Sequence, residues 1–295
     1  MRYQTPAALE MAAKAATRRL ALDTGRAMTG FYFHRLLCRI FSDPHHAFVL
    51  KGGQSMLART MDARATKDID LLCKESSLER ALEELKRLAA ADLGDYMRFT
   101  LKSADPIKVE DEYRSGLRVV FQPTLGSKSQ QPIAIDLVVD EVPLDRAELI
   151  TPADRIEIEG LPVCDYLVYP VENALADKLC ALVERHDRRA SSRVKDLVDI
   201  AVYAVTCSID GGKLRERMLQ EGAVRGIVLP ETFCIPDEWG APHERQYERL
   251  CSQTGLPHSL RSIDASVELA GKLFNPVYVG FADGMTWNPV TRAWE

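Results

Sequence analysis

One stretch of the chain, residues 47–73, constrains the fold more than any other. An apolar run at 47–51 predicts a buried strand, and the two glycines that follow it predict a tight turn. A short helix is expected at 53–60, and a second apolar run predicts another strand at 68–73. This order of strand, glycine turn, helix and strand predicts a sheet that is covered by helices, which is an α/β type of fold.

The second of these strands carries two aspartates one residue apart, Asp68 and Asp70. Because residues i and i+2 of a strand point to the same face, the two carboxylates share one side while Ile69 points to the other. Neighbouring carboxylates repel each other, so such a pair beside a glycine turn indicates a divalent cation and a phosphate. The pattern predicts nucleotidyl transfer, in which a hydroxyl attacks the α-phosphate of a nucleoside triphosphate and pyrophosphate leaves.

A third carboxylate is expected from a neighbouring strand, and Asp136 is the best candidate. It is a lone acid within the apolar run 133–139. Burying an unpaired carboxylate is costly, so a cation or strong hydrogen-bond donors should lie nearby. An aspartate that caps a turn or pairs with an arginine would give the same pattern. Beside the pair Asp68 and Asp70, we expect a metal ligand.

The glycine turn is expected to bind phosphate. Gly52 and Gly53 let backbone amides approach phosphate oxygens, and Ser55 adds a hydroxyl at the start of the helix. Lys51 and Lys67 flank the turn and could contact phosphates or simply face solvent. Glycine pairs are common in turns, so this prediction depends on the aspartate pair that follows.

The remaining pattern predicts a mixed α/β core between two helical parts. We expect an N-terminal helical lead over 1–45, an α/β core over 46–170 and a helical C-terminal domain over 171–295. Thr5 and Ser76 are expected to cap helices. The further helices are expected at 6–22, 27–41, 76–91, 172–188, 192–206, 211–221, 243–254 and 260–273, and the further strands at 96–102, 107–113, 117–122 and 132–142.

Composition narrows the class of protein. The chain has 295 residues, of which 46% are hydrophobic and 27% charged, as in one large or two smaller globular domains. No apolar run reaches the roughly 18 residues of a membrane-spanning helix, and the N-terminus lacks the apolar core of a signal peptide. Seven scattered cysteines without a C-x-x-C pair predict reduced thiols rather than disulfides or a zinc site. We therefore expect a cytoplasmic protein that has no membrane partner.

Charge is distributed unevenly along the chain. The formal net charge is −5, yet residues 1–42 hold seven basic and two acidic residues. This positive excess could face RNA, and a solvated helix face explains it equally well. A second basic cluster could hold a triphosphate or an RNA backbone, or face solvent. Its members are Arg185, Arg188, Arg189 and Arg193.

Two sets of motifs resemble a known family. Residues 52–55 together with 66–70 resemble the first motif of DNA polymerase β-like nucleotidyltransferases. Further along, residues 172–179 and 193–200 resemble the AbiEii/MenT group of nucleotidyltransferase toxins from bacterial toxin–antitoxin systems. The matches cover 47–203, about half the chain. The resemblance implies an α/β (α+β) fold, with a polymerase β-like core on a mixed sheet and a helical C-terminal domain.

The resemblance also assigns roles to single residues. That group carries a lysine on one helix and an aspartate at the start of the next, and Lys178 and Asp196 occupy these positions here. Lys178 borders the apolar stripe of its helix, where its ammonium can reach a triphosphate or remain in water. Asp196 is placed to orient Lys178, Lys195 or the attacking hydroxyl, although the helix dipole alone also favours an acid there. Thr66 stands where the family carries a serine or threonine that can be modified.

The function implied by the resemblance is that of a toxin. Such a protein transfers a nucleoside monophosphate from a nucleoside triphosphate to the 3′ end of tRNA with Mg²⁺, which blocks translation. A cognate antitoxin, the tRNA acceptor end and a monomeric chain are implied as well. The alternatives are a transferase that acts on a protein or small-molecule hydroxyl, and an inactive fold that binds a nucleotide or a partner. Three sets of site residues are expected. Those that act in catalysis are Asp68, Asp70, Lys178 and Asp196. Those that bind the nucleotide are Gly52, Gly53, Ser55, Lys67 and Lys178, and those that bind the metal are Asp68, Asp70 and Asp136.

Overall fold

The computed structural model describes residues 3–18, 24–74, 77–107, 114–140, 146–185 and 189–295. The chain divides into two units, each with buried hydrophobic residues of its own. The first unit comprises Met1–Arg59, Ala65–Glu141 and Ala147–Val168. The second unit comprises Thr60–Arg64, Val142–Arg146 and Tyr169–Glu295.

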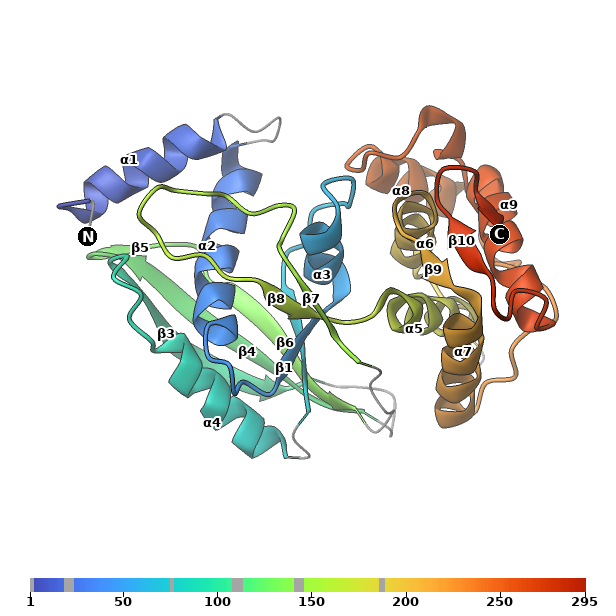
Figure 1. The fold of residues 1–295 in the computed structure, drawn as a ribbon, viewed down its shortest axis with the longest axis horizontal. Helices are drawn as coiled ribbons and strands as arrows, with labels where there is room; N and C mark the ends of the chain where they lie inside the picture. Colours follow the sequence, from blue (N-terminus) through green and yellow to red (C-terminus); the bar gives the residue numbers. More distant parts are fainter. Residues whose placement is uncertain (1–2, 19–23, 75–76, 108–113, 141–145, 186–188) are drawn as a thin grey trace. The chain divides into compact units, whose positions relative to one another are not determined.

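The first unit is built on a mixed β-sheet (Figure 1). Its described strands are β1 (Phe48–Lys51), β2 (Ile69–Cys73), β3 (Met97–Pro106), β4 (Arg114–Leu125), β5 (Lys128–Ser129), β6 (Ile133–Asp140), β7 (Glu148–Ile150) and β8 (Tyr166–Val168). Their order across the sheet is β3-β4-β6-β2-β1-β8-β7, and β5 pairs with β4. The pairs β2–β6 and β1–β8 are parallel, and the other pairs are antiparallel.

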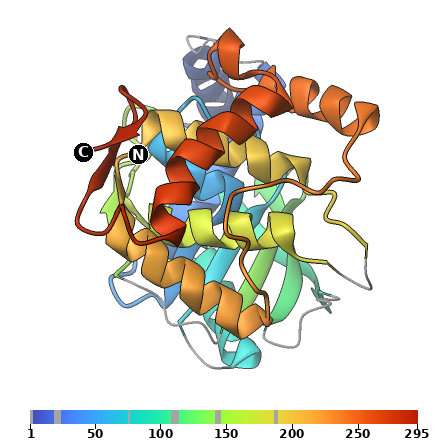
Figure 2. The same ribbon diagram turned by 90° about the vertical axis from the view of Figure 1, so that its right-hand side faces the viewer.

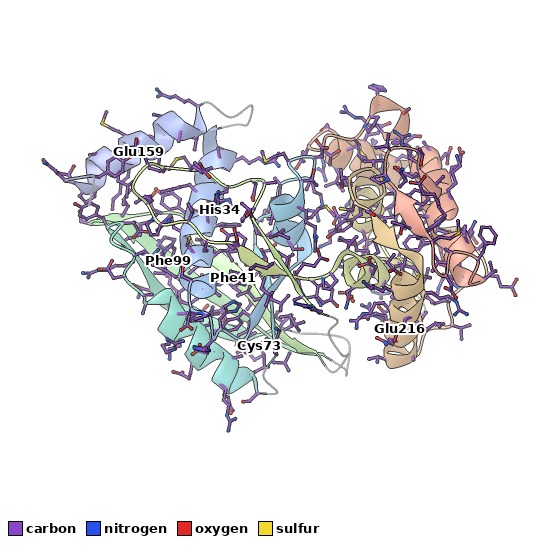
Figure 3. The ribbon with its side chains drawn as sticks, viewed as in Figure 1. His34, Phe41, Cys73, Phe99, Glu159 and Glu216 are labelled. Carbon is purple, nitrogen blue, oxygen red and sulfur yellow. The ribbon has the colours of Figure 1, made fainter. Side chains whose placement is uncertain are left out.

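Helices of the first unit cover one face of this sheet. They are α1 (Pro6–Thr17), α2 (Thr24–Phe41), α3 (Gly52–Arg59) and α4 (Leu78–Ala89). Helices α2 and α4 pack on each other and on the sheet, and α1 packs on α2. Alternate strand residues such as Leu71 and Ile135 join this core, as do Phe41, Cys73 and Phe99, which are labelled in Figure 3. The residues between them therefore point to the opposite face of the sheet.

Local capping signals set the starts of two helices. Thr5 precedes α1, and its Oγ1 accepts a hydrogen bond from the backbone N–H of Ala8 at 3.1 Å, as predicted. Helix α4 is capped by Ser77, whose side chain accepts from the N–H of Arg80. The prediction of Ser76 as the cap is therefore wrong by one residue, and Ser76 itself lies outside the described residues.

Two arginines of α2 stabilise the core of the first unit. The carboxylate of Asp95 is fully buried and accepts hydrogen bonds from Nε of Arg35 and Nη2 of Arg39, both at 2.7 Å. The guanidinium of Arg39 also donates to the carbonyl of Met97 and lies 4.9 Å from the ring centroid of Phe99. Buried charges persist where opposite charges and hydrogen bonds surround them. The expectation that the N-terminal positive charge faces RNA is therefore wrong for these two arginines.

The second unit is mainly helical (Figure 2). Its helices are α5 (Val171–Val183), α6 (Val194–Thr206), α7 (Gly211–Arg225), α8 (Ala241–Cys251), the 3₁₀ helix η1 (His258–Leu260) and α9 (Ile263–Tyr278). Helix α5 packs with α6 and α7, and α6 also packs with α8 and α9. Three short strands, β9 (Ile209–Asp210), β10 (Thr286–Asn288) and β11 (Ala293–Trp294), form a small antiparallel sheet. Trp287 anchors this sheet to α6, because its buried Nε1 donates to the carbonyl of Ala204 at 2.8 Å.

The mixed sheet followed by helices confirms the predicted fold class. Strands β9, β10 and β11 were not expected, since two or three residues are too few to form a readable pattern. The strand predicted at 107–113 falls almost wholly outside the described residues. Within the described part of the chain, none of the helices combines the length and apolar character that crossing a bilayer requires.

Candidate active site

A row of charged residues crosses the face of the first unit's sheet that lies opposite its helices. Asp70 of β2 is in register with Lys51 of β1 and with Asp136 of β6. Asp136 is in turn in register with Arg118 of β4. Residues in register on neighbouring strands point to the same face, so these side chains stand next to one another. The sheet thus places two of the three predicted metal ligands, Asp70 and Asp136, on adjacent strands.

Arg118 joins Asp136 to the remaining predicted carboxylate, Asp68. Its Nη1 lies 2.7 and 3.0 Å from the two carboxylate oxygens of Asp136, and its Nη2 lies 3.6 Å from Oδ2 of Asp68. The side chain of Arg118 is 47% exposed, so solvent reaches these groups. Its positive charge reduces the repulsion between the carboxylates. Sequence analysis missed Arg118 because only the pairing of β4 with β6 reveals its place.

The aspartate motif packs directly on the glycine turn. Gly52 has a φ of +62°, and a Cβ atom there would lie 1.8 Å from Oδ2 of Asp70. A Cβ atom on Gly53 would lie 3.1 Å from Cβ of Thr66. Thr66 is itself held by the motif, since its Oγ1 donates to the carbonyl of Asp68 at 3.0 Å. Both glycines are therefore explained by the close approach of side chains, that of Asp70 in β2 and that of Thr66 just before β2.

Ser55 and Lys67, which were also predicted to bind the nucleotide, lie on or beside this turn, whereas Lys178 belongs to α5 of the second unit. Ser55 is buried, and its Oγ donates to the carbonyl of Gly52 at 2.9 Å within the first turn of α3. Lys67 is exposed, whereas Lys51 is only 8% exposed and lies in register with Asp70. The backbone N–H groups at the start of α3 add partial positive charge to the turn.

The donor set of this face fits a divalent cation of the magnesium type. Hard cations prefer oxygen ligands, and Asp68, Asp70 and Asp136 supply carboxylates on one side of the sheet. Among the described residues, no three acidic, histidine or cysteine side chains converge closely enough to hold a metal ion as they stand. In the structure, the guanidinium of Arg118 supplies the positive charge beside these carboxylates. A cation at these carboxylates would therefore compete with its guanidinium.

The second unit holds a buried cluster of charges around Lys178 of α5. Nζ of Lys178 lies 3.1 Å from Oδ1 of Asp196 and 2.6 Å from Oδ2 of Asp199, both on α6. The lysine side chain is 11% exposed and the two carboxylates are 3% and 1% exposed. Arg193 donates to the other oxygen of Asp196 at 2.6 Å. Arg64 donates two hydrogen bonds to Asp199, at 2.9 and 3.1 Å.

This cluster gives Lys178 two carboxylate partners where the sequence suggested one. Asp196 and Asp199 are three residues apart, so both lie on the face of α6 that meets α5. That spacing could have revealed Asp199 from the sequence. Arg64 could not have been found in this way, because 135 residues separate it from Asp199 along the chain.

The charges of the cluster hold one another in their ionised forms. Burial alone would raise the pKa of Asp196, but Lys178 and Arg193 outweigh it and lower that pKa to about 2. Burial likewise opposes the charge of Lys178, yet Asp199 and Asp196 raise its pKa above the usual value. Lys178 is therefore a fixed cation at neutral pH, suited to neutralising phosphate rather than to accepting a proton.

Several basic residues that were predicted to face RNA have acidic partners. Arg185 forms an ion pair with Glu238. In the N-terminal region, Lys14 pairs with Glu10 at 2.7 Å. Arg188 lies outside the described residues. The role of the arginine cluster in RNA binding stays a prediction.

Most of the chain matches one protein family. A family model described as nucleotidyl transferase AbiEii toxin, type IV toxin–antitoxin system, matches residues 35–285. The protein is thus a nucleotidyltransferase. It belongs to the AbiEii family of nucleotidyltransferase toxins from type IV toxin–antitoxin systems. This confirms the resemblance noted over residues 47–203 and extends it further into the second unit.

Solved structures provide similar folds. MenT4, a nucleotidyltransferase toxin from Mycobacterium tuberculosis H37Rv, is 17% identical to this chain, with a TM-score of 0.58 over 92% of this chain and 89% of its own. JHP933 from Helicobacter pylori is 16% identical, with a TM-score of 0.40 over 70% of this chain and 82% of its own. Comparison with curated proteins finds no match. The likeness to MenT4 shows that the two chains share a fold.

Replacing Gly52 by alanine should displace Asp70. The added Cβ would lie 1.8 Å from the carboxylate oxygen at a positive φ, so the turn or the aspartate must move. We expect nucleotide transfer to fall about a hundredfold, as displacements of about 1 Å can cause. Gly30→Ala within α2 is the matched control, because nothing lies within 4 Å of a Cβ there. Equal transfer by the two variants would contradict the packing.

Removing the charge of Arg118 should strengthen the binding of divalent cations. In Arg118→Gln, Asp136 and Asp68 lose the guanidinium that competes for their charge. We expect the Kd for Mn²⁺, measured by isothermal titration calorimetry at fixed ionic strength, to fall about five- to tenfold. Arg98→Gln, at an exposed arginine of β3, should leave it unchanged. Weaker binding by Arg118→Gln would show that Arg118 supports the cation instead.

The depressed pKa of Asp196 should make stability depend on acidic pH. Its folded-state pKa of about 2 lies below the usual aspartate value of 3.8, so its contribution to stability is present above pH 4 and is lost as the pH falls toward 2. The shift corresponds to about 2 kcal/mol. In urea unfolding at pH 6 to pH 3, Asp196→Asn should therefore lose less unfolding free energy than the wild type. If the unfolding free energies of the two proteins fall in parallel with pH, this assignment is refuted. The control Asp264→Asn, at an exposed acid, should behave as the wild type does.

Proposed function

We propose that the protein transfers a nucleoside monophosphate from a nucleoside triphosphate to the 3′ end of tRNA, with Mg²⁺ as cofactor, and thereby blocks translation. Membership of the AbiEii family supports the transfer chemistry and the toxin role. The observation that carries the proposal is the packing of Asp70 on Gly52, which would join a carboxylate that binds the metal to a turn that binds phosphate. The choice of tRNA rests on the resemblance of the sequence motifs to the AbiEii/MenT group.

The first unit is proposed to hold the cation and the phosphates. Asp68, Asp70 and Asp136 would bind Mg²⁺, which neutralises the charge of the triphosphate and of the leaving pyrophosphate. The backbone N–H groups of the glycine turn would bind phosphate oxygens, with Lys67 beside them. Asp70 lies against the turn itself, so a single rigid segment would orient both the carboxylate and the phosphate-binding amides.

Lys178 of the second unit is proposed to bind the triphosphate as a fixed positive charge. An ammonium has three N–H donors, and Asp196 and Asp199 accept two of them. The third is available for a phosphate oxygen. Asp196 and Asp199 would then act as positioning residues, because they hold the ammonium in one place and keep it protonated.

The proposed setting follows from the same family. A type IV toxin implies an antitoxin that counters it. We propose that the protein acts as a monomer in the cytoplasm, where the acceptor end of tRNA is its substrate. The attacking group would be the terminal ribose hydroxyl of that acceptor end.

The proposal is tested with purified protein, each radiolabelled nucleoside triphosphate in turn, Mg²⁺ and total RNA. We expect label at the 3′ end of tRNA, in a form that a 3′ exonuclease removes. Asp68→Asn and Lys178→Met should each reduce the label at least about a hundredfold, since each removes charge stabilisation from the transfer. Melting temperatures of the variants should show that the fold is kept.

Matched controls come from exposed residues of the second unit. Asp264→Asn and Lys272→Met change an exposed acid and a lysine that is 59% exposed, and both should retain full transfer. Label in protein rather than tRNA would replace the proposed acceptor with a protein hydroxyl. If Asp68→Asn transferred nucleotide at the wild-type rate, the carboxylate face would have no part in the mechanism.

A further inference from the structure

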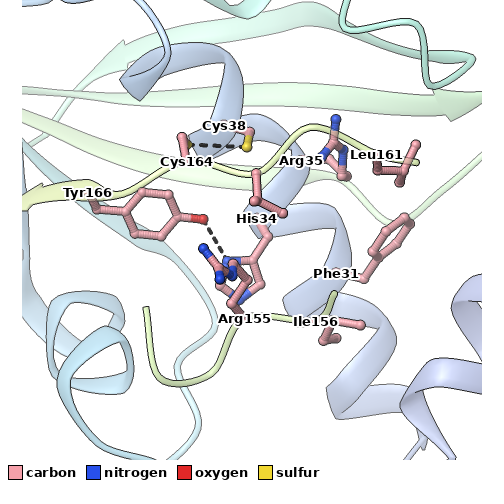
Figure 4. Close-up of a pocket in the computed structure, with 10 residues that line it drawn as sticks. Phe31, His34, Arg35, Cys38, Arg155, Ile156, Leu161, Cys164 and Tyr166 are labelled. Carbon is pink, nitrogen blue, oxygen red and sulfur yellow. Dashed lines mark hydrogen bonds between the residues drawn. The ribbon is translucent and has the colours of Figure 1, made fainter. Parts of the chain in front are cut away.

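Two cysteines of the first unit lie in contact. Cys38 is on α2, and Cys164 lies in the segment that leads into β8 (Figure 4). Their sulfur atoms are 3.2 Å apart, with the thiol of Cys164 donating to that of Cys38. Both are free thiols. A disulfide needs a sulfur–sulfur distance of about 2.05 Å, so a shift of roughly 1 Å would suffice for bonding.

The pair lines a small pocket that gives access to it. The pocket has a cavity volume of about 10 Å³, room for roughly one water-sized molecule, and is partly open to solvent. Cys38 is 3% exposed, while Cys164 is partly exposed. Because Cys164 belongs to neither a helix nor a strand, it can move toward Cys38 more easily than a residue of α2 could. The residues that share the lining with the two cysteines include Phe31, His34, Arg35 and Tyr166.

The surroundings of Cys38 favour its thiolate. Arg35 is 3% exposed, and its guanidinium donates to Asp95 and to the carbonyl of Pro162. Its Nη2 is buried without a hydrogen-bond partner among the described residues. The hydrogen bond from Cys164 lowers the pKa of Cys38 below that of a free thiol; burial opposes this, and the charge of Arg35 adds to it.

A different cysteine shows how unusual this environment is. Cys180 of α5 is fully buried, and burial raises its pKa to about 12. Thiols that react with oxidants are those with thiolate character and a route to solvent. Cys38 has thiolate character but is only 3% exposed, so the pair meets solvent through the partly exposed Cys164, which supplies the second sulfur.

We propose that Cys38 and Cys164 form a reversible disulfide when the protein meets a peroxide. The Cys38 thiolate attacks one oxygen of hydrogen peroxide, the O–O bond breaks, and hydroxide leaves; Cys38 becomes a sulfenic acid. The sulfur of Cys164 then attacks the Cys38 sulfur, the S–O bond breaks, and the hydroxide combines with the Cys164 proton as water. In sum, two thiols lose two electrons and two protons, and the peroxide becomes two waters. A small thiol reverses the bond by thiol–disulfide exchange.

The bond would link α2 to the segment that leads into β8. Its two residues are 126 positions apart in the chain, and linking them restricts the unfolded state strongly. The segment of Cys164 leads into β8, which pairs with β1 between Leu50 and Val168. Strand β1 ends at the glycine turn. Oxidation is therefore expected to stabilise the first unit around this turn.

The test uses the full chain in a Cys234→Ser background, which removes an exposed cysteine. Reduced protein is treated with hydrogen peroxide, alkylated, digested without reductant and analysed by mass spectrometry. We expect one cross-linked peptide pair that contains residues 38 and 164, the loss of two free thiols, and full reversal by dithiothreitol. The melting temperature of the oxidised protein should rise by several degrees.

Variants separate the pair from the other thiols. Cys207→Ser, at a partly exposed cysteine of the second unit, should keep the cross-link. Cys164→Ser keeps a hydroxyl donor beside Cys38 but cannot form the disulfide, so it should lose the cross-link and accumulate a sulfenic acid on Cys38 that dimedone traps. The proposal is overturned if peroxide leaves Cys38 and Cys164 open to alkylation, or if it links other cysteines instead.

Discussion

The carboxylate face of the first unit depends on one close contact, that of the Asp70 carboxylate with the backbone of Gly52. The contact restricts position 52 to a residue without a side chain. It also requires β2 to lie beside β1 in the register that pairs Asp70 with Lys51. Helix α3 must then begin at the turn, with its first N–H groups beside the carboxylate. A single packing contact thus couples the chain reversal, the strand register and the electrostatics of the site.

Hydrogen bonds between the protein's own side chains hold both charged clusters together. Asp136 is held by Arg118 on the sheet, and Lys178 is held by Asp196 and Asp199 between two helices. The two clusters differ in exposure, since Arg118 is 47% exposed and Lys178 only 11%. Displacing an exposed guanidinium from its carboxylate partners costs little free energy, whereas displacing a buried ammonium costs much more. One cluster is suited to exchange partners and the other to present a fixed charge.

Sequence reasoning succeeded where neighbours along the chain determine the structure. The strand, glycine turn and aspartate strand are local, so their pattern predicted the fold class, while the roles of the two aspartates stay predictions. Arg118 was missed because its role depends on the register of β4 against β6. Arg35 and Arg39 looked like surface charges because their partner, Asp95, is 60 and 56 residues away along the chain. Long-range pairing is the information that a single sequence lacks.

The position of Thr60–Arg64 limits how the chain can be divided into fragments. The chain on both sides of this segment belongs to the first unit, while the segment itself belongs to the second. There the carbonyl of Asp62 accepts from the N–H of Gly255 at 2.9 Å, and Arg64 neutralises Asp199. Neither unit is therefore a continuous piece of polypeptide. A fragment of residues 169–295 would lack the guanidinium of Arg64 that pairs with Asp199, so a fragment or chimera of the second unit has to include residues 60–64.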